Sequence, residues 1–210
     1  MTRRGRALYL PVKRAVDVLV AGLGLLVTAP VMAVVAVAVR RDVGSPVLFR
    51  QQRPGRYGEP FELVKFRTMR TLGSTDSVAN DAERLTPFGR RLRSTSLDEL
   101  PTLWNVLRGH MSLVGPRPLL MEYLDRYTPV QARRHEVRPG VTGLAQVRGR
   151  NLLSWEEKFA SDVEYVDRVG PLLDARILVA TLVTVLRRQG ISAPDTATMH
   201  LFTGSRQDAA

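Results

Sequence analysis

The sequence predicts an α+β fold that is mostly helical, with an N-terminal helix that enters a membrane and a small β-hairpin after it. The 22 residues from Val18 to Val39 carry no charged side chain, and about 20 apolar residues suffice to cross a bilayer core. Beyond residue 40, most apolar residues recur at helical spacings, and one pair of short runs is strand-like. We therefore expect a membrane helix in residues 1–40, a folded domain in 41–195 and a short polar tail in 196–210.

Charge and a proline indicate how the apolar segment lies in the membrane. Pro30 removes a helical hydrogen bond and bends a helix, so a helix broken at Ala29-Pro30 could return to the face that it entered. Basic side chains prefer the cytoplasmic side of a membrane, and a re-entrant helix would keep both flanks of the segment on that side. The flanking basic residues are Arg3, Arg4, Arg6, Lys13 and Arg14 before the segment, and Arg40 and Arg41 after it.

Two other interpretations of the segment stay open. An ordinary kinked helix would cross the bilayer once and would place one basic flank on the unfavoured side. A secretory signal peptide would have a shorter apolar region of about 7–15 residues, followed by a cleavage site.

Two polar residues, one within the segment and one directly before it, have simple expected roles. The hydroxyl of Thr28 would bond a backbone group that Pro30 leaves free. The carboxylate of Asp17 would form a local ion pair with Lys13 or Arg14, which lie four and three residues earlier on the same helix face.

The remaining elements follow from local patterns. Val47–Phe49 and Phe61–Val64 are strand-like runs separated by residues typical of turns, which predicts a hairpin. Apolar spacing predicts an amphipathic helix from Leu100 to Gly109. Further helices are expected over 86–93, 120–127, 130–136, 155–169 and 172–188, whereas 71–81 and 138–150 have the composition of loops.

Composition narrows the possible chemistry. Lys and Arg number 31 against 20 Asp and Glu, and this net charge of +11 favours a polyanionic partner such as a nucleic acid, an anionic membrane or a phosphorylated substrate. The absence of Cys excludes disulfides, thiolate zinc sites and cysteine nucleophiles. The three histidines have no metal-ligand spacing, and the chain lacks the glycine-rich motifs of conventional nucleotide-binding folds.

The first candidate for chemistry is the pair Asp98-Glu99, at the start of the predicted helix. A helix N-terminus favours an ionised carboxylate by about 0.3–1 kcal/mol, and an ionised aspartate can bind Mg²⁺ or attack phosphorus. The alternative is structural, because Ser96 and Glu99 fit a capping box and Asp98 could itself be an N-cap.

The second candidate is a group of cations framed by glycine and proline or placed near Asp98. Guanidinium groups bind phosphate oxygens through two parallel hydrogen bonds, and rigid framing lowers the entropy lost on binding. The alternative for any one of them is a solvated basic surface. The candidate phosphate-binding cations are Lys65, Arg93, Arg117, Arg138 and Arg150.

Several long, collinear motifs resemble the bacterial sugar transferases, in particular the small monotopic phosphoglycosyl transferases. The motifs are KRAVDVLVAGLGLLVTAPV (13–31), FRQQRPGRYGEPFELVKFRTM (49–69), LTPFGRRLRSTSLDELPTLWNVLRGHMSLVGPRPL (85–119) and RPGVTGLAQVRGRN (138–151). The resemblance continues through residues 155–174 and so covers nearly the whole chain.

The resemblance implies an enzyme at the cytoplasmic face of the bacterial inner membrane, monotopic and surrounded by membrane lipid. Such enzymes transfer a sugar-1-phosphate from a UDP-sugar to polyprenol phosphate (undecaprenyl phosphate) and release UMP. This is the first membrane step of glycan assembly. Mg²⁺ is the implied cofactor, and no nucleic acid is expected beyond the nucleotide of the donor. The donor sugar is left open between N-acetylated hexosamines and plain hexoses.

Site residues carry over by their place in these motifs. Asp98 would attack the phosphorus that bears the sugar, and Asp98 and Glu99 would hold the metal. The matching helix of the family breaks at a proline that corresponds to Pro30, where many relatives have Ser before the proline and this chain has Ala29. Contacts to phosphate, nucleotide or metal would come from Lys65, Arg93, Arg117, Arg138, Arg150 and Asp174.

Two hypotheses of other classes compete with the enzyme. In a membrane-bound scaffold, residues 96–99 would only cap a helix. A membrane-tethered nucleic-acid binder is suggested by charge alone, and an aromatic content of 6% offers no stacking platform.

Overall fold

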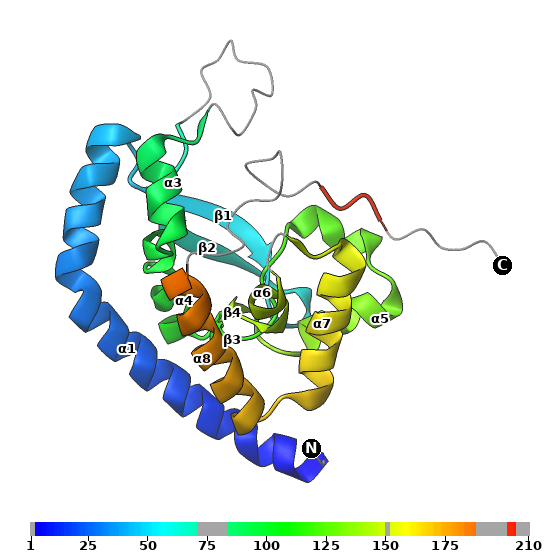
Figure 1. The fold of residues 1–210 in the computed structure, drawn as a ribbon. Helices are drawn as coiled ribbons and strands as arrows, with labels where there is room; N and C mark the ends of the chain where they lie inside the picture. The colour runs from blue at the N-terminus through cyan, green and yellow to red at the C-terminus, as the bar shows by residue number, and fades with distance from the viewer. Residues whose placement is uncertain (1–2, 71–83, 150–151, 188–200, 205–210) are drawn as a thin grey trace.

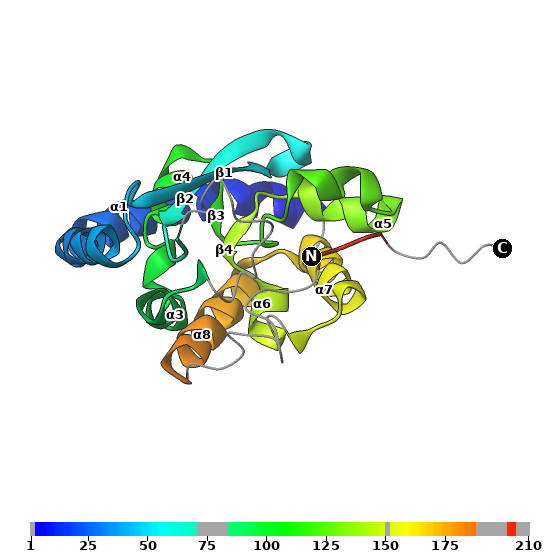
Figure 2. The same cartoon turned by 90° about the horizontal axis from the view of Figure 1, so that it is seen from above.

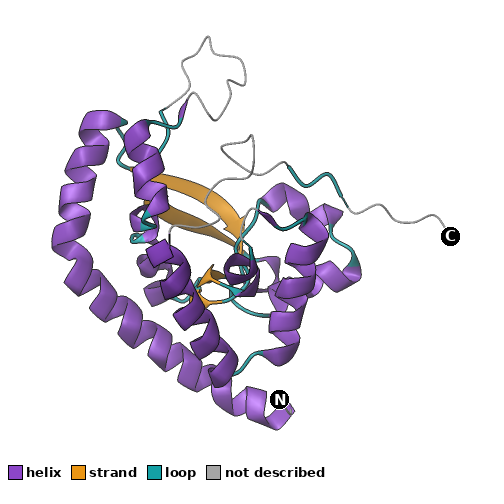
Figure 3. Cartoon of the chain, viewed as in Figure 1, coloured by secondary structure: helices purple, strands orange, loops and turns teal. Residues whose placement is uncertain are grey.

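A computed structural model describes residues 3–70, 84–149, 152–187 and 201–204 of the 210-residue chain. The predicted loop at 71–81 and Arg150 lie outside these residues. As expected, the fold is mostly helical with one long apolar N-terminal helix and a small hairpin (Figures 1 and 3). Seen from above, the hairpin lies on the opposite side of the molecule from helix α8 (Figure 2).

The N-terminal helix α1 (Arg3–Asp42) curves along one side of the molecule and continues as a helix through Pro30 (Figure 1). Its part from Leu8 to Asp42 is long and apolar enough to cross a membrane by length and composition alone. Only 11% of its most apolar stretch is buried in the protein, so this stretch is not an ordinary core helix. These properties suggest a membrane protein.

The predicted hairpin consists of strands β1 (Leu48–Pro54) and β2 (Pro60–Phe66), paired antiparallel with Leu48 opposite Phe66. The 3-10 turn η1 (Arg56–Gly58) joins them. A second sheet was not expected: β3 (Ser112–Val114) pairs in parallel with β4 (Gly140–Thr142). Each of these strands has only three residues, which is too short for a readable alternation, and β4 falls in the segment expected to be a loop.

Helices account for most of the rest. Helix α3 (Pro87–Ser94) begins at Thr86, whose hydroxyl accepts a hydrogen bond from the Gly89 amide. Helix α4 (Thr102–Arg108) ends at Gly109, which has a φ of 86° that glycine adopts without strain. The other elements are the 3-10 turns η2 (Leu97–Glu99), η3 (Met121–Arg126) and η4 (Arg133–Glu136), and the helices α5 (Pro129–Ala132), α6 (Leu144–Arg148), α7 (Trp155–Arg168) and α8 (Pro171–Arg187).

The part of the tail that the structure describes, residues 201–204, has a packing role. The side chain of Phe202 is 2% exposed and lies in an aromatic cluster with Tyr123, Phe159 and Trp155. Its backbone amide donates to the Tyr123 hydroxyl at 3.1 Å. The sequence predicts only a short polar tail here.

Polar side chains attach the first half of α1 to the domain. The expected ion pair of Asp17 with Lys13 or Arg14 is wrong, because all three side chains have partners elsewhere. Asp17 is buried and accepts from the Leu113 amide at 3.0 Å. Arg14 donates to the carbonyls of Val106 and Leu107, at the end of α4, at 2.6 and 2.9 Å. These tertiary partners satisfy buried groups that a local pair would leave unbonded.

Lys13 pairs instead with Asp174, at the start of α8, across 2.5 Å. The Asp174 carboxylate also accepts from the hydroxyls of Tyr9 (2.6 Å) and Tyr165 (2.8 Å). Its side chain is 8% exposed, and that of Lys13 is 12% exposed. These contacts give Asp174 a structural function. The expected contact with substrate stays a prediction.

Thr28 does not bond the group that Pro30 leaves free. Because a helical amide bonds the carbonyl four residues earlier, Pro30 frees the carbonyl of Leu26. The Thr28 hydroxyl donates instead to the Gly24 carbonyl at 2.7 Å. A hydroxyl reaches the carbonyl four residues before it most readily, which is the position of Gly24.

His135 shows how η4 is attached to the hairpin. Its Nδ1 lies 3.2 Å from the carbonyl oxygen of Gly55, and its Nε2 is buried without a hydrogen-bond partner. Burial and the adjacent charge of Arg134 lower the pKa of His135 to about 4. The neutral imidazole, with its proton on Nδ1, is therefore the form that fits the folded protein.

Replacing Asp174 by Asn should destabilise the protein by about 3 kcal/mol, because Lys13 would keep a buried charge without its counter-charge. Thermal unfolding in detergent measures the change. Asp167→Asn, which removes an exposed carboxylate of the same kind, is the matched control and should have little effect. Unchanged stability together with a raised KM for the donor would instead favour a substrate contact.

Stability should fall by about 2–3 kcal/mol between pH 7 and pH 4.5 through His135 alone. In that range the unfolded chain takes up a proton at an imidazole with a pKa near 6.5, whereas the folded protein does not until about pH 4. His135→Gln should remove this part of the pH dependence, as measured by unfolding at both pH values. His110→Gln alters an exposed histidine and should keep the wild-type slope.

Candidate active site

An unusual turn between α3 and α4 positions Asp98. Ser96 adopts a φ of 57° and a ψ of 15°, in the left-handed region, and the next three residues form η2. The Ser96 side chain makes no capping hydrogen bond, and the residue that precedes α4 is Pro101. The capping-box and N-cap interpretations of residues 96–99 are therefore wrong. A left-handed non-glycine residue costs about 1–3 kcal/mol and often accompanies a functional site.

The Asp98 carboxyl is buried, with 5% of the residue exposed. None of the described residues donates a hydrogen bond to it. Burial and the neighbouring negative charge of Glu99 raise its pKa to about 6, although Lys65, Arg93 and Arg117 act in the opposite direction. The carboxylate is thus mostly ionised at neutral pH, but weakly solvated and without a bonding partner, which are properties of a nucleophile or metal ligand rather than of a structural cap.

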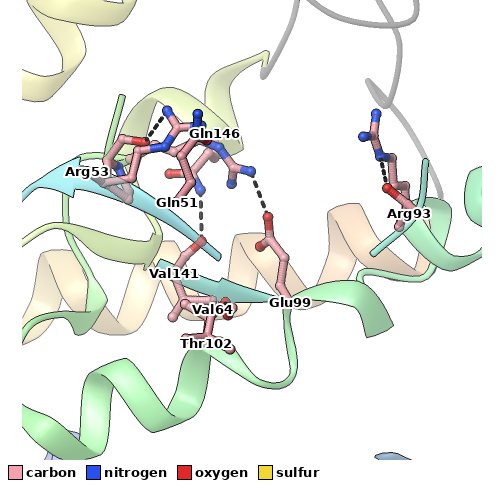
Figure 4. Close-up of polar contacts among 11 residues, drawn as sticks. Gln51, Arg53, Val64, Arg93, Glu99, Thr102, Val141 and Gln146 are labelled. Carbon is pink, nitrogen blue, oxygen red and sulfur yellow. Dashed lines mark hydrogen bonds and ion pairs between the residues drawn. The ribbon is translucent and has the colours of Figure 1, made fainter. Parts of the chain in front are cut away.

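Three of the expected cations surround this carboxyl. Arg117 pairs with Glu99 across 2.7 Å, and Arg93 donates to the Thr68 hydroxyl at 3.0 Å (Figure 4). Lys65 comes from β2, and burial lowers its pKa to about 8 while Asp98 and Glu99 oppose the shift. Residues from β2, α3, η2 and the segment after β3 therefore converge on one point, where an anion would meet several positive charges.

Three residues beside this cluster were not expected from the sequence: Gln51, Arg53 and Gln146. Arg53 donates to the Gln51 side chain at 2.6 Å, and Gln146 donates to the Val141 carbonyl at 2.9 Å (Figure 4). The charge of Arg117 contributes to lowering the pKa of Arg53 to about 10, after the larger effect of burial. Arg53 Nε and Gln146 Oε1 are buried without partners. They lie within the motifs quoted above, but nothing in their local spacing marks them.

A buried ion pair is hydrogen-bonded to the backbone of Arg117. Arg134 and Asp162 interact across 2.8 Å, with side chains 2% and 5% exposed. Arg134 also donates to the Arg117 carbonyl at 2.7 Å. Moving either partner away would leave the other as an unpaired buried charge, which is costly. The pair therefore keeps Arg134, and with it the Arg117 carbonyl, in a fixed position.

Other expected site residues lie elsewhere. Arg138 donates to the Gly109 carbonyl at 2.8 Å, and its neighbouring charges are Arg14, Arg56 and Asp17, not Asp98. Asp174 belongs to the attachment of α1. Both assignments to substrate stay predictions, and the contacts shown here give these two residues other partners.

The acidic pair Asp98-Glu99 has the chemistry of a Mg²⁺ ligand. Among the described residues, no three His, Asp or Glu side chains lie together as a metal cage. Magnesium, however, is often held by one or two carboxylates and completes its shell with water and substrate phosphates. The pKa of Asp98 is raised by burial and by the negative charge of Glu99. A bound cation would offset both the loss of solvation and the repulsion between the two carboxylates. Asp98 and Glu99 therefore fit a metal that binds together with a diphosphate.

Comparison with known proteins gives the family. Residues 8–188 match the model of the bacterial sugar transferases. A Bacillus subtilis protein named uncharacterized sugar transferase EpsL is 51% identical over 196 residues, which cover 92% of this chain and 96% of that protein.

Two further relatives are named UDP-glucose:undecaprenyl-phosphate glucose-1-phosphate transferase. The one from Caulobacter vibrioides is 40% identical over 83% of this chain and 69% of its own length. The one from Escherichia coli K12 is 39% identical over 81% of this chain, but only 39% of its own length is matched. With a family match over most of its residues and such relatives, the chain belongs to the bacterial sugar transferase family.

Proposed function

We propose that this enzyme transfers a sugar-1-phosphate from a UDP-sugar to undecaprenyl phosphate and releases UMP, with Asp98 as the nucleophile. One observation carries the proposal: the Asp98 carboxyl is buried among three cations, has a raised pKa and accepts no hydrogen bond from the residues that the structure describes. The names of the relatives from Caulobacter vibrioides and Escherichia coli support the substrate classes.

In the first step, an oxygen of the ionised Asp98 carboxylate attacks the phosphorus that bears the sugar. A bond forms between this oxygen and phosphorus, the bond to the bridging oxygen breaks, and UMP leaves with the electron pair. Lys65, Arg93 and Arg117 would bind the diphosphate oxygens and stabilise the negative charge that develops on them. The weak solvation of Asp98 favours attack, since few hydrogen bonds must be given up.

In the second step, a phosphate oxygen of the polyprenol phosphate attacks the same phosphorus. The bond between phosphorus and Asp98 breaks, which regenerates the carboxylate and yields a polyprenol diphosphate sugar. Dividing the transfer into two displacements lets the two bulky substrates use one site in turn.

Mg²⁺ is part of the proposal, with Asp98 and Glu99 as the residues that would hold it. A bound Mg²⁺ supplies positive charge to the phosphoryl oxygens and to the leaving phosphate. The pairing of Glu99 with Arg117 would keep that carboxylate oriented toward the diphosphate.

We further propose that α1 is re-entrant, with its turning point at Ala29-Pro30, and that the enzyme is monotopic on the cytoplasmic face of the bacterial inner membrane. The curvature of α1 (Figure 1) and the basic residues at both of its ends support this topology. It would hold Asp98 near the depth of the lipid phosphates, where the acceptor presents its headgroup.

For the sugar, the relatives' names favour UDP-glucose as the first donor to test. A panel of UDP-sugars that includes UDP-galactose and UDP-N-acetylglucosamine, assayed by UMP release, would identify the donor.

Asp98→Asn should reduce UMP release by at least about a thousandfold with UDP-sugar, undecaprenyl phosphate and Mg²⁺ present, because an amide oxygen is a poor nucleophile toward phosphorus. Asp125→Asn removes an exposed carboxylate and should retain wild-type activity. If the Asp98 variant had wild-type activity and the same melting temperature as the wild type, the nucleophile assignment would be disproved and the scaffold hypothesis favoured.

The topology can be tested directly because the chain has no native cysteine. Single cysteines at Thr2 and Ser45 should both react with a membrane-impermeant maleimide in inside-out vesicles, and neither should react in intact spheroplasts. Labelling of the two positions from opposite sides would show that α1 crosses the bilayer.

A further inference from the structure

A small polar cavity lies apart from the Asp98 cluster, between the first half of α1 and the segments around β3 and η4. Its volume is about 50 Å³. A cavity needs about 10–15 Å³ of such space for one water molecule, so this one has room for a group of about four oxygen atoms, as in a phosphate. It shares no lining residue with the cluster around Asp98. The polar residues that line it are Lys13, Arg14, Asp17, Arg56, Ser112, Glu136, Arg138 and Tyr165.

Ser112 is one of the residues that line this cavity, and its hydroxyl makes no hydrogen bond. The residue is 2% exposed, and its Oγ is buried without a hydrogen-bond partner. A buried hydroxyl without a partner costs about 1–3 kcal/mol, and nearly all such groups in folded proteins are bonded.

The charges at the cavity are unbalanced. Arg14, Arg56 and Arg138 contribute three positive charges, and burial together with the charges of the other two lowers the pKa of Arg138. Asp17 contributes the one negative charge without a counter-ion of its own, since its carboxylate accepts from a backbone amide.

The other two pairs of charges at the cavity are neutralised. Lys13 is paired with Asp174, and Glu136 is paired with Arg133. An excess of two positive charges in a partly buried space favours an anion.

The arginines retain donors for such an anion. Hydrogen bonds fix the position of each: Arg14 donates through Nη1 and Nη2 to two carbonyls at the end of α4. Arg56 donates to the Glu136 carbonyl and to the Tyr57 hydroxyl, and Arg138 donates to the Gly109 carbonyl. The bonds of Arg138 and Arg56 to these carbonyls run through Nε. Guanidinium groups held in this way are preorganised, which lowers the entropy lost when they bind a phosphate.

The position on α1 indicates where the anion comes from. The lining residues of α1 lie between Leu10 and Asp17, directly before the uncharged stretch that begins at Val18. At 1.5 Å per residue, Arg14 lies about 6 Å along the helix from that stretch, which is the level of lipid headgroups when the apolar part is in the bilayer.

We propose that this cavity binds the phosphate group of an anionic membrane phospholipid, through Arg14, Arg56, Arg138 and the Ser112 hydroxyl. The bound lipid would join α1 to β3 and η4 at the membrane surface and give the unsatisfied hydroxyl its partner. The proposal requires α1 to lie in a membrane but is independent of the sugar, the nucleotide and the nucleophile.

The test is a ligand titration of the full chain in dodecyl maltoside, followed by thermal unfolding. The probes are dihexanoyl phosphatidylglycerol, dihexanoyl phosphatidylcholine and inorganic phosphate. Phosphatidylglycerol should raise the melting temperature to a plateau. Phosphatidylcholine and inorganic phosphate should need at least about five times its concentration to give the same rise. Arg56→Gln and Arg138→Gln should each raise the apparent Kd about tenfold. Arg168→Gln, at an exposed arginine of α7, should bind like the wild type.

Ser112→Ala keeps the test decisive if an arginine variant folds poorly. It should leave the lipid-free protein as stable as the wild type, or more so, because it removes a hydroxyl without a partner, and it should weaken lipid binding about threefold. Wild-type binding in Ser112→Ala and in both arginine variants would mean that the cavity holds only water, and would overturn the proposal. Equal effects of inorganic phosphate and phosphatidylglycerol would overturn the lipid assignment.

The test is separate from that of the proposed function. Asp98→Asn keeps every residue of the cavity and should bind phosphatidylglycerol like the wild type. Loss of UMP release and loss of lipid binding can therefore be observed independently.

Discussion

The attachment of α1 through buried polar side chains is the constraint on which the rest of the structure depends. Lys13, Arg14 and Asp17 lie on one helix face and bond, respectively, to α8, to the end of α4 and to β3. Apolar contacts alone could let an exposed membrane helix slide or rotate, whereas hydrogen bonds between buried groups allow one register. Because α4 follows directly on η2, this attachment also determines where Asp98 lies relative to the apolar segment.

A balance of opposite charges explains how strongly charged groups can gather at the candidate active site. Asp98 and Glu99 are adjacent and would repel each other, and Lys65, Arg93 and Arg117 would do so too. Each set offsets the other, so the cluster is tolerable without substrate but remains poorly solvated. An incoming diphosphate would meet preformed positive charge, and the ion pair of Arg134 with Asp162 holds the backbone of Arg117 in place.

Much of the fold could be predicted from sequence because the signals are local. The hairpin has turn residues between two apolar runs, and α4 has an apolar spacing and a glycine at its end. Asp98, Glu99 and the nearby cations could be proposed because the motifs that contain them are long. The pairing of β3 with β4 could not, since 25 residues separate two strands of three residues each. The roles of Asp17 and Asp174 were also missed, because partners 96 and 161 residues away leave no local pattern.

By itself, the sequence determined that this chain has an apolar segment long enough for a membrane, a basic surface and an acidic pair in the motif of a sugar transferase. Those properties depend on residue type and on spacing along the chain. Only the tertiary structure decided which cations meet Asp98 and which, like Arg138, meet one another at a second cavity. The sequence shows which residues are charged but not which groups their side chains face. Burial and distance alone decide whether an arginine faces a carboxylate, a carbonyl or an anion.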